Sequence, residues 1–291
     1  MDIRAIAMGL LFAFLWSSAF TSARIIVADA PPIAISAIRF SLAGLIGIAI
    51  ARALGQSWRL TPAQWRATLI FGLCQNAIYL GLNFQAMTTV EASLASIIAS
   101  SMPLIVAFLG WAALREKLSP LATIGLVLGF GGVMVIMWGK ISHGVDIFGV
   151  MLCIVGAIAL AVATLMVRGA SSGGNILMVV GLQMFVGAGI LLIVSLLFES
   201  WEFNWNGKMG AAFVYTLFGP GLLATWMWFS LVSRIGVVQA STFHFLNPFF
   251  GVAVAAIVLG EGFGLIDVIG VVVIAAGIFA VQISKQSDTL K

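Results

Sequence analysis

Residues 103–116, PLIVAFLGWAALRE, and residues 248–261, PFFGVAVAAIVLGE, are apolar stretches of equal length that each begin with proline and end with glutamate. The second stretch follows the first by 145 residues. Further pairs that match at or next to this offset are Gly125 and Gly270, Gly132 and Gly277, Ala95-Ser96 and Ala240-Ser241, and Arg24 and Arg168. The chain therefore contains an internal repeat that covers both of its halves.

Lipid is the expected solvent for most of the chain. Of its 291 residues, 62% are hydrophobic and only 8% are charged, and the mean hydropathy is +1.16, far above a soluble domain. A helix that crosses a membrane needs about 20 apolar residues. Residues 30–51 form one such window, interrupted only by Arg39. Windows without any charged residue are 5–23, 67–90, 92–114, 118–139, 147–167, 169–198, 209–233, 235–260 and 268–284. We therefore predict an all-α integral membrane protein with ten transmembrane helices.

The charges between these windows predict the orientation of the helices. With the N-terminus inside, ten basic residues fall in inner segments and three in outer segments, while seven acidic residues fall outside. An excess of Lys and Arg marks cytoplasmic loops. This places both termini in the cytoplasm of a bacterial-type inner membrane, and the net charge of +4 then concerns topology and not nucleic acid.

The repeat predicts how the two halves are arranged. Five helices per half is an odd number, so the halves, residues 1–141 and 142–291, have opposite orientations in the membrane. Inverted repeats are typical of secondary transporters, because the halves can exchange conformations and open one site alternately to either side. A duplicated scaffold that transports nothing is the alternative.

Several short motifs resemble a known family. They are Trp16-Ser17-Ser18, Ile35-Ser36-Ala37-Ile38-Arg39-Phe40, and the pairs Pro103 with Glu116 and Pro248 with Glu261. Together they resemble the EamA type of the drug/metabolite transporter superfamily over the whole chain and, within it, the YddG-type exporters of aromatic and other neutral amino acids. The resemblance implies two inverted five-helix repeats around a central cavity, with Trp16 and Ser17 among its lining. Helices one, three, four, six, eight and nine are expected to form this cavity.

The third and fourth predicted helices carry polar side chains in apolar surroundings. The third contains Gln75, Asn76, Tyr79 and Asn83. Steps of three and four residues place such side chains along one helix face, and polar groups that face lipid are costly. We expect this stripe to line a water-filled cavity and to bind substrate, or else to form hydrogen bonds between helices. Ser96 and Ser100 of the fourth helix either line the same cavity or allow close helix packing.

Three prolines are predicted hinges. Pro103 and Pro248 fall near the middles of the fourth and ninth helices, where proline frees the carbonyl four residues earlier. We expect these carbonyls, of Ala99 and His244, to face each other and accept hydrogen bonds from a substrate ammonium, although simple kinks are the alternative. The third hinge is Pro220, in a Gly219–Gly221 segment that is expected to make the eighth helix discontinuous.

Aromatic residues of the eighth and ninth helices are further candidates. Trp226 and Trp228 follow the Pro220 segment, and the ninth helix adds His244 and Asn247. These residues predict an aromatic-lined cavity that holds an apolar substrate side chain, although aromatic residues are also common elsewhere in membrane proteins. His244 could serve proton coupling or act only as a hydrogen-bonding group.

Other features are assigned structural roles. Arg39, the only cation inside a predicted span, is expected to reach the membrane surface or find carbonyl or acidic partners. Glu116 and Glu261 are expected to anchor loops or helix ends. Small residues mark faces for tight helix packing, either within a monomer or in a homodimer, and they are Gly125, Gly129, Gly270 and Gly277.

The sequence also disfavours several functions. No carboxylate lies in the middle of a predicted span, which argues against proton-coupled export of lipophilic cations. An enzyme is disfavoured because metal motifs are missing and Ser241 with His244 lacks a nucleophile motif; no metal, cofactor or ATP hydrolysis is expected. The favoured function is export of aromatic and other neutral amino acids by alternating access. Export of a purine or nucleoside, a channel, and a scaffold are the alternatives.

Overall fold

The computed structural model describes residues 3–115, 117–142, 144–166, 173–236, 240, 242–262 and 264–289, which form helices joined by short connections. The helices of the first half are α1 (Ile3–Val27), α2 (Pro32–Ala53), α3 (Pro62–Phe71), η1 (Gly72–Leu80), α4 (Gly81–Ala86), α5 (Ala92–Ser100), α6 (Met102–Leu114) and α7 (Pro120–Ser142). The second half contains α8 (Ile147–Met166), α9 (Ile176–Phe198), α10 (Gly207–Thr216), η2 (Leu217–Leu223), α11 (Ala224–Ile235), η3 (Thr242–Leu246), α13 (Asn247–Leu259) and α14 (Leu265–Thr289).

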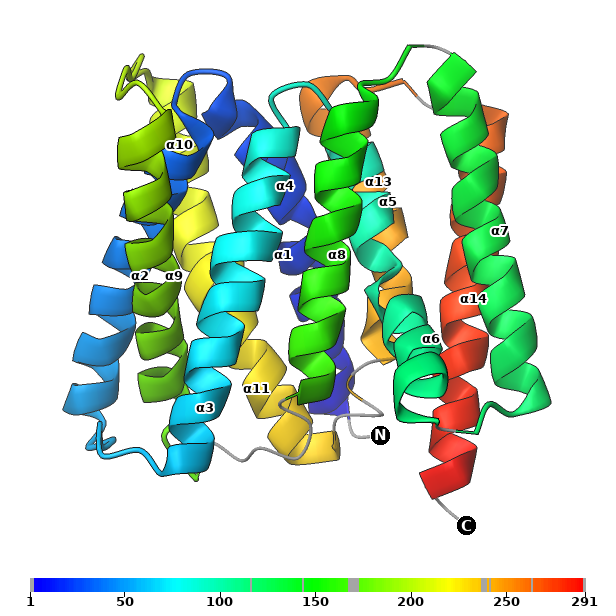
Figure 1. Cartoon of the computed structure of the whole chain (residues 1–291), viewed down its shortest axis with the longest axis horizontal. Helices are drawn as coiled ribbons and strands as arrows, with labels where there is room; N and C mark the ends of the chain where they lie inside the picture. The colour runs from blue at the N-terminus through cyan, green and yellow to red at the C-terminus, as the bar shows by residue number, and fades with distance from the viewer. Residues whose placement is uncertain are drawn as a thin grey trace.

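These helices confirm the predicted membrane fold. Among the described residues, nine helical stretches are long and apolar enough to cross a membrane, and Phe243–Leu259 is a shorter apolar helix. Large apolar side chains such as Phe198 and Ile257 are at least 80% exposed, as expected where lipid surrounds the bundle. Both termini lie on one face of the bundle (Figure 1), as an even number of crossings requires. The protein is a multi-pass integral membrane protein.

The two halves follow the same helical plan. The third span changes from α-helix to the π-helical segment η1 at Gly72, and the eighth span changes to the π-helical segment η2 at Leu217, 145 residues later. The fourth span breaks at Ser101 between α5 and α6. At the matching place in the ninth span, η3 ends at Leu246 and α13 begins. The repeat in the sequence is therefore also a repeat of local backbone structure.

Glycines hold the last helices of the two halves together. A Cβ atom on Gly277 of α14 would lie 2.6 Å from the carbonyl oxygen of Gly125 and 2.6 Å from the amide nitrogen of Gly129, both in α7. A Cβ atom on Gly132 would likewise lie 3.0 Å from the carbonyl oxygen of Gly270. These glycines serve packing within the chain, because only hydrogen fits between the two backbones.

Two carboxylates cap helices of other spans. Glu199 accepts hydrogen bonds from the amides of Ile33 and Ala34 at 2.9 and 2.7 Å, at the start of α2. Glu261 accepts hydrogen bonds from the amides of Ala92 and Ser93 at 2.8 and 2.9 Å, at the start of α5. The first amides of a helix lack partners within it, and its positive end favours an anion. Glu261 is thus a helix-end anchor; Glu116, Arg168 and Ser241 lie outside the described residues.

The structure places the three predicted hinge prolines in backbone surroundings other than those expected, and their role as hinges stays a prediction. A discontinuous eighth helix is wrong, because η2 continues the helix through Pro220; π-helical turns shift the backbone hydrogen bonds, so a residue without an amide hydrogen fits. Pro103 and Pro248 do not kink continuous helices either, because each occupies the first turn of a new segment, α6 or α13. The amide hydrogen that proline lacks has no partner in a first turn.

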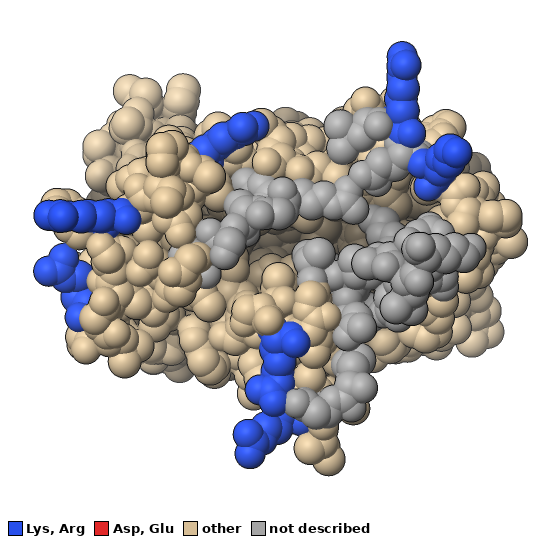
Figure 2. Space-filling model, turned by 90° about the horizontal axis from the view of Figure 1, so that it is seen from below, with Lys and Arg blue, Asp and Glu red and all other residues tan. Residues whose placement is uncertain are grey.

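The face that carries both termini is basic. Figure 2 looks onto this face and shows Lys and Arg side chains around its rim, no Asp or Glu among the described residues in view, and a hollow near its centre. Described acidic residues at the opposite ends of the spans are Asp29, Glu91, Asp146, Glu199, Glu202, Glu261 and Asp267. The charge asymmetry of the sequence is therefore an asymmetry between the two faces.

Candidate functional site

A cavity lies among the first, second, third, seventh and eighth spans. Its lining comes from α1, α2, η1, α4, α9, η2 and α11, with Met87 and Thr216 at the ends of α4 and α10. The space between the lining atoms, including its opening, is about 550 Å³. The predicted set of helices was therefore partly wrong. Helices one, three and eight line this cavity as predicted. Helices four, six and nine do not, and helices two and seven line it instead.

Close packing explains why the fourth and sixth spans are absent from the lining. A Cβ atom on Gly251 of α13 would overlap the Ser96 hydroxyl of α5. A Cβ atom on Gly156 of α8 would lie 3.0 Å from Nδ2 of Asn83 and 3.2 Å from the carbonyl oxygen of Tyr79. Small residues thus bring α5 onto α13 and α8 onto the third span, and they leave no space there.

The predicted polar stripe of the third span faces the cavity. Gln75, Asn76, Tyr79 and Asn83 all line it, and each of these side chains is at most 8% exposed. Asn76 Nδ2 donates to the carbonyl oxygen of Gln183 in α9 at 2.9 Å. Asn83 Nδ2 donates to the carbonyl oxygen of Tyr79 at 2.7 Å. Asn76 therefore joins two helices and lines the cavity at once, which combines both interpretations of the stripe.

Arg39 of α2 is a cavity residue that the sequence did not assign to the site. Its side chain is 3% exposed and lines the cavity. Its Cζ lies 4.1 Å from the ring centre of Phe40 and 5.0 Å from that of Phe84, distances typical of cation–π contacts. Its Nε and Nη2 atoms have no hydrogen-bond partner among the described residues. We expected a carbonyl or acidic partner for Arg39, but the described residues provide none for Nε or Nη2.

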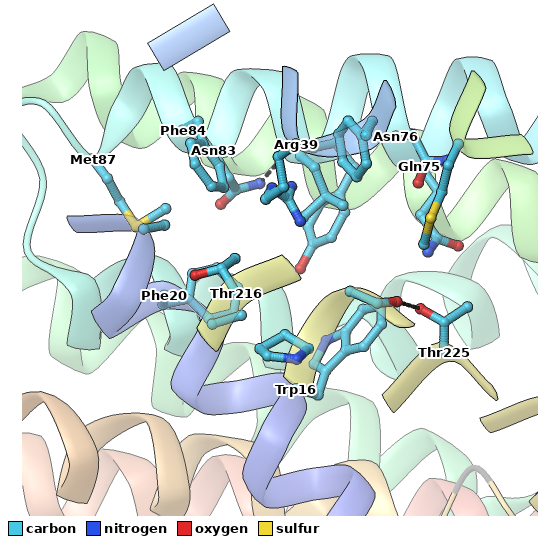
Figure 3. Close-up of a pocket in the computed structure, with 18 residues that line it drawn as sticks. Trp16, Phe20, Arg39, Gln75, Asn76, Asn83, Phe84, Met87, Thr216 and Thr225 are labelled. Carbon is cyan, nitrogen blue, oxygen red and sulfur yellow. Dashed lines mark hydrogen bonds between the residues drawn. The ribbon is translucent and has the colours of Figure 1, made fainter. Parts of the chain in front are cut away.

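An aromatic wall and two hydroxyl groups complete the cavity. Trp16 and Phe20 of α1 face the third span across the space (Figure 3). Thr216 donates to Ser22 Oγ at 2.7 Å and Thr225 donates to the carbonyl oxygen of Gly221 at 2.6 Å. The sequence pointed to Trp16 but not to Phe20, Thr216 or Thr225. A threonine in an apolar helix is too common to reveal a site.

Several predicted site residues lie outside this lining. Pro220 is the only predicted hinge in it. Trp226 is 40% exposed on the side of the bundle, so a role at the cavity does not fit it. The carbonyl pair of Ala99 and His244 does not reach the cavity either, because neither residue lines it. The other predicted residues that it does not include are Ser17, Ser96, Ser100, Trp228, Asn247, Pro103 and Pro248.

Trp228, His244 and Asn247 instead belong to a mainly aromatic cluster next to the cavity, together with Phe12 and Trp16. Ring centres lie 5.7 Å apart for Phe12 and Trp16, 5.2 Å for Phe12 and Trp228, and 5.0 Å for Trp228 and His244. Asn247 Nδ2 lies 2.9 Å from His244 Nδ1. Because Trp16 belongs to both groups, this cluster separates the cavity from the end of the bundle where α1 begins.

Hydrogen bonds join α1 to α10 on the other side of the cavity. Ser18 Oγ lies 2.6 Å from the hydroxyl of Tyr215, and Thr216 donates to Ser22. Beyond the end of α1, Asn206 Nδ2 donates to a carboxylate oxygen of Asp29 at 2.7 Å. The cavity is thus closed by polar contacts toward the acidic face.

Comparisons with known proteins agree with this architecture. An uncharacterized transporter, YvbV, of Bacillus subtilis is 25% identical over 96% of this chain and 92% of its own length. An uncharacterized transporter of Archaeoglobus fulgidus is 26% identical over 91% of this chain and 94% of its own. A solved crystal structure has the same fold, with a TM-score of 0.70 and 20% identity over the full length of both chains. The model of the EamA-like transporter family matches residues 3–138 and again residues 147–283, and the chain therefore belongs to this family.

Proposed function

We propose that this transporter exports neutral amino acids, aromatic ones first, by alternating access across a bacterial-type inner membrane. The observation that carries the proposal is the composition of the cavity. Aromatic side chains of Trp16, Phe20 and Phe84 adjoin the amides of Gln75 and Asn83. Binding sites for small molecules combine such apolar surfaces with a few polar groups that orient the ligand. The resemblance to YddG-type exporters points to the same cargo.

The lining also argues against organic cations. The described residues that form it include Arg39 but no Asp or Glu. A cationic substrate next to a buried guanidinium would be repelled, and no carboxylate would compensate its charge. A neutral zwitterion avoids this cost because its two charges can each find a partner.

The repeats supply a physical basis for alternating access. The two π-helical segments occupy equivalent positions and both contribute to the cavity. The first does so through Gln75, Asn76, Tyr79 and Leu80, and the second through Pro220 and Gly221. Because π-helical turns interrupt the regular hydrogen-bond pattern, each is a place where its span can bend. Contacts between α1 and α10 close the cavity toward the acidic face. The aromatic cluster of Phe12, Trp228 and His244 separates it from the basic face, which has a hollow near its centre (Figure 2).

The orientation follows from charge. The basic face carries both termini (Figures 1 and 2), and basic residues accumulate on the cytoplasmic side. We therefore place both termini in the cytoplasm, the hollow on the cytoplasmic side, and the closed α1–α10 contacts on the outer side. Substrate from the cytoplasm must then pass the aromatic cluster of Phe12, Trp228 and His244 to reach the cavity.

The proposal is tested by flux into proteoliposomes. Labelled phenylalanine, threonine and a purine are compared, with and without a pH gradient, for the wild type and for Tyr79→Ala. We expect saturable phenylalanine flux that falls strongly in Tyr79→Ala and persists in Phe198→Ala, whose side chain is 80% exposed on α9. Flux of the purine alone would refute amino-acid export.

A further inference from the structure

Two buried side chains that line the cavity have polar atoms without hydrogen-bond partners, and these atoms are donors in one residue and an acceptor in the other. Nε and Nη2 of Arg39 are hydrogen-bond donors, and Oδ1 of Asn83 is an acceptor; none of the three has a partner among the described residues. Arg39 is 3% exposed and Asn83 is 1% exposed. Buried donors and acceptors are rarely left unpaired, because each then loses its hydrogen bonds to water without compensation. Two such residues in one cavity indicate a ligand that supplies both partners.

The orientation of both groups is fixed by neighbouring contacts. The guanidinium of Arg39 lies over the rings of Phe40 and Phe84, and Phe84 adjoins Asn83 in α4. The amide of Asn83 cannot turn without loss, since its Nδ2 donates to the carbonyl oxygen of Tyr79. Figure 3 shows Arg39 and Asn83 on the same wall of the cavity, opposite Trp16 and Phe20.

The free edge of Arg39 matches a carboxylate. Nε and Nη2 lie on one edge of the planar guanidinium and donate two parallel hydrogen bonds, which is the pattern that a carboxylate accepts. A free amide oxygen such as Oδ1 of Asn83 accepts a hydrogen bond from an ammonium group. Both charged groups are carried by one carbon atom in an α-amino acid.

We propose that Arg39 and Asn83 form the head-group site of this transporter, in which Arg39 binds the carboxylate of an α-amino acid and Asn83 Oδ1 binds its ammonium. The substrate side chain then lies against Trp16, Phe20 and Tyr79. This inference rests on the proposed function and adds to it a rule of specificity. An amino acid satisfies both residues, the corresponding 2-oxo acid satisfies only Arg39, and the corresponding amine satisfies only Asn83 beside an uncompensated cation.

The test measures binding of three ligands to the purified full-length protein in lipid nanodiscs. Phenylalanine, phenylpyruvate and phenethylamine compete against labelled phenylalanine, and flux of each is measured in proteoliposomes. For the wild type, we expect phenylalanine to compete best, phenylpyruvate less well and phenethylamine least. Equal competition by phenethylamine and phenylalanine would overturn the assignment of Arg39.

Variants separate the two roles. Arg39→Gln should weaken binding of phenylalanine and phenylpyruvate by about tenfold or more, since it removes the charged partner of the carboxylate. Asn83→Leu should weaken binding of phenylalanine but leave phenylpyruvate unchanged. Arg39→Lys should recover part of the affinity, because the cation is kept but the paired donors are lost. Matched controls are Arg52→Gln, an exposed arginine at the end of the same helix, and Gln282→Leu, a buried amide of α14 outside the cavity.

Stability distinguishes binding from a structural role. Removal of a buried cation without a partner should keep or raise the Tm of Arg39→Gln, whereas an arginine that holds helices together would lower it. If Arg39→Gln does not fold, the effect of Asn83→Leu still tests the inference, because this variant should weaken binding of phenylalanine and not of phenylpyruvate. Unchanged phenylalanine affinity in folded Arg39→Gln and Asn83→Leu would overturn this inference alone. Absence of flux for all three ligands in the wild type would instead remove the proposed function and the head-group site with it.

Discussion

Replacement of Gly277 by alanine should destabilise the fold, because its Cβ would meet backbone atoms of α7. The new atom would lie 2.6 Å from Gly125 O and Gly129 N and 2.7 Å from Gly129 Cα. Ordinary contact begins near 3.4 Å, so the helices must separate by roughly 0.8 Å. Backbone atoms cannot rotate out of the way, and overpacking of this kind costs about 1–3 kcal/mol.

The helical preference of alanine over glycine offsets part of that cost, by about 1 kcal/mol. We therefore expect a net loss of up to about 2 kcal/mol and a Tm lower by up to roughly 6 °C. The assay is thermal unfolding in detergent, followed by tryptophan fluorescence. Gly131→Ala is the matched control on α7, because a Cβ there meets nothing within 4 Å. A Tm of Gly277→Ala no lower than that of Gly131→Ala, which gains the same helical preference without a clash, would refute the packing argument.

Three further changes probe the helix caps and the aromatic cluster. Glu261→Gln should lower the Tm, because hydrogen bonds from the start of α5 to a charged acceptor are worth about 1.5–3 kcal/mol; a drop no larger than that of Glu202→Gln would count against the cap. A hydrogen bond from Thr89, and amides at the start of α8, lower the pKa of Asp146, so its stabilisation is present above the ordinary pKa of a carboxyl and is lost as pH falls through the depressed one. Tm measured against pH should accordingly fall less steeply in acid for Asp146→Asn. Phe12→Ala should make a cysteine placed at Gln75 react faster with a thiol reagent added from the side of the termini, and an unchanged rate would show that the cluster does not close that side.

The architecture could be predicted because it depends on residues that act at long range in the sequence. Pro103 and Pro248 mark equivalent helix starts, and Gly125 and Gly277 lie on faces that pack tightly, as the sequence predicted, although it did not indicate that these two residues meet. Lipid requires every span to satisfy its own backbone, so length and charge-free windows suffice to count helices. The same reasoning cannot say which face of a span meets a neighbour.

The candidate site was predicted only in part for that reason. Tyr79 and Asn83 are costly in lipid wherever they lie, so their place inside the bundle followed from chemistry. Ser96 is equally compatible with a cavity and with close packing, and the structure places it against Gly251. Arg39 was assigned a structural role because a lone cation usually finds a partner, whereas its two free donors become visible only when its neighbours are known.

The change to π-helix at Gly72 and Leu217 also escaped prediction. These segments share no motif beyond their place in the repeat. π-helical turns occur mostly as short bulges within α-helices, frequently at functional sites, and no motif shared by these two segments marks them. Only the contact of η1 with the cavity through Asn76 and Tyr79 shows why this irregularity matters.

Trans-stimulation of phenylalanine flux tests most directly whether the cavity belongs to an alternating-access carrier. Proteoliposomes are loaded with unlabelled phenylalanine, and entry of labelled phenylalanine is followed for the wild type and for Tyr79→Ala. We expect entry to be saturable and accelerated by the internal substrate, because the carrier returns faster when loaded, and we expect Tyr79→Ala to lose this acceleration. Entry that rises linearly with concentration and ignores the internal substrate would show a channel and contradict the mechanism.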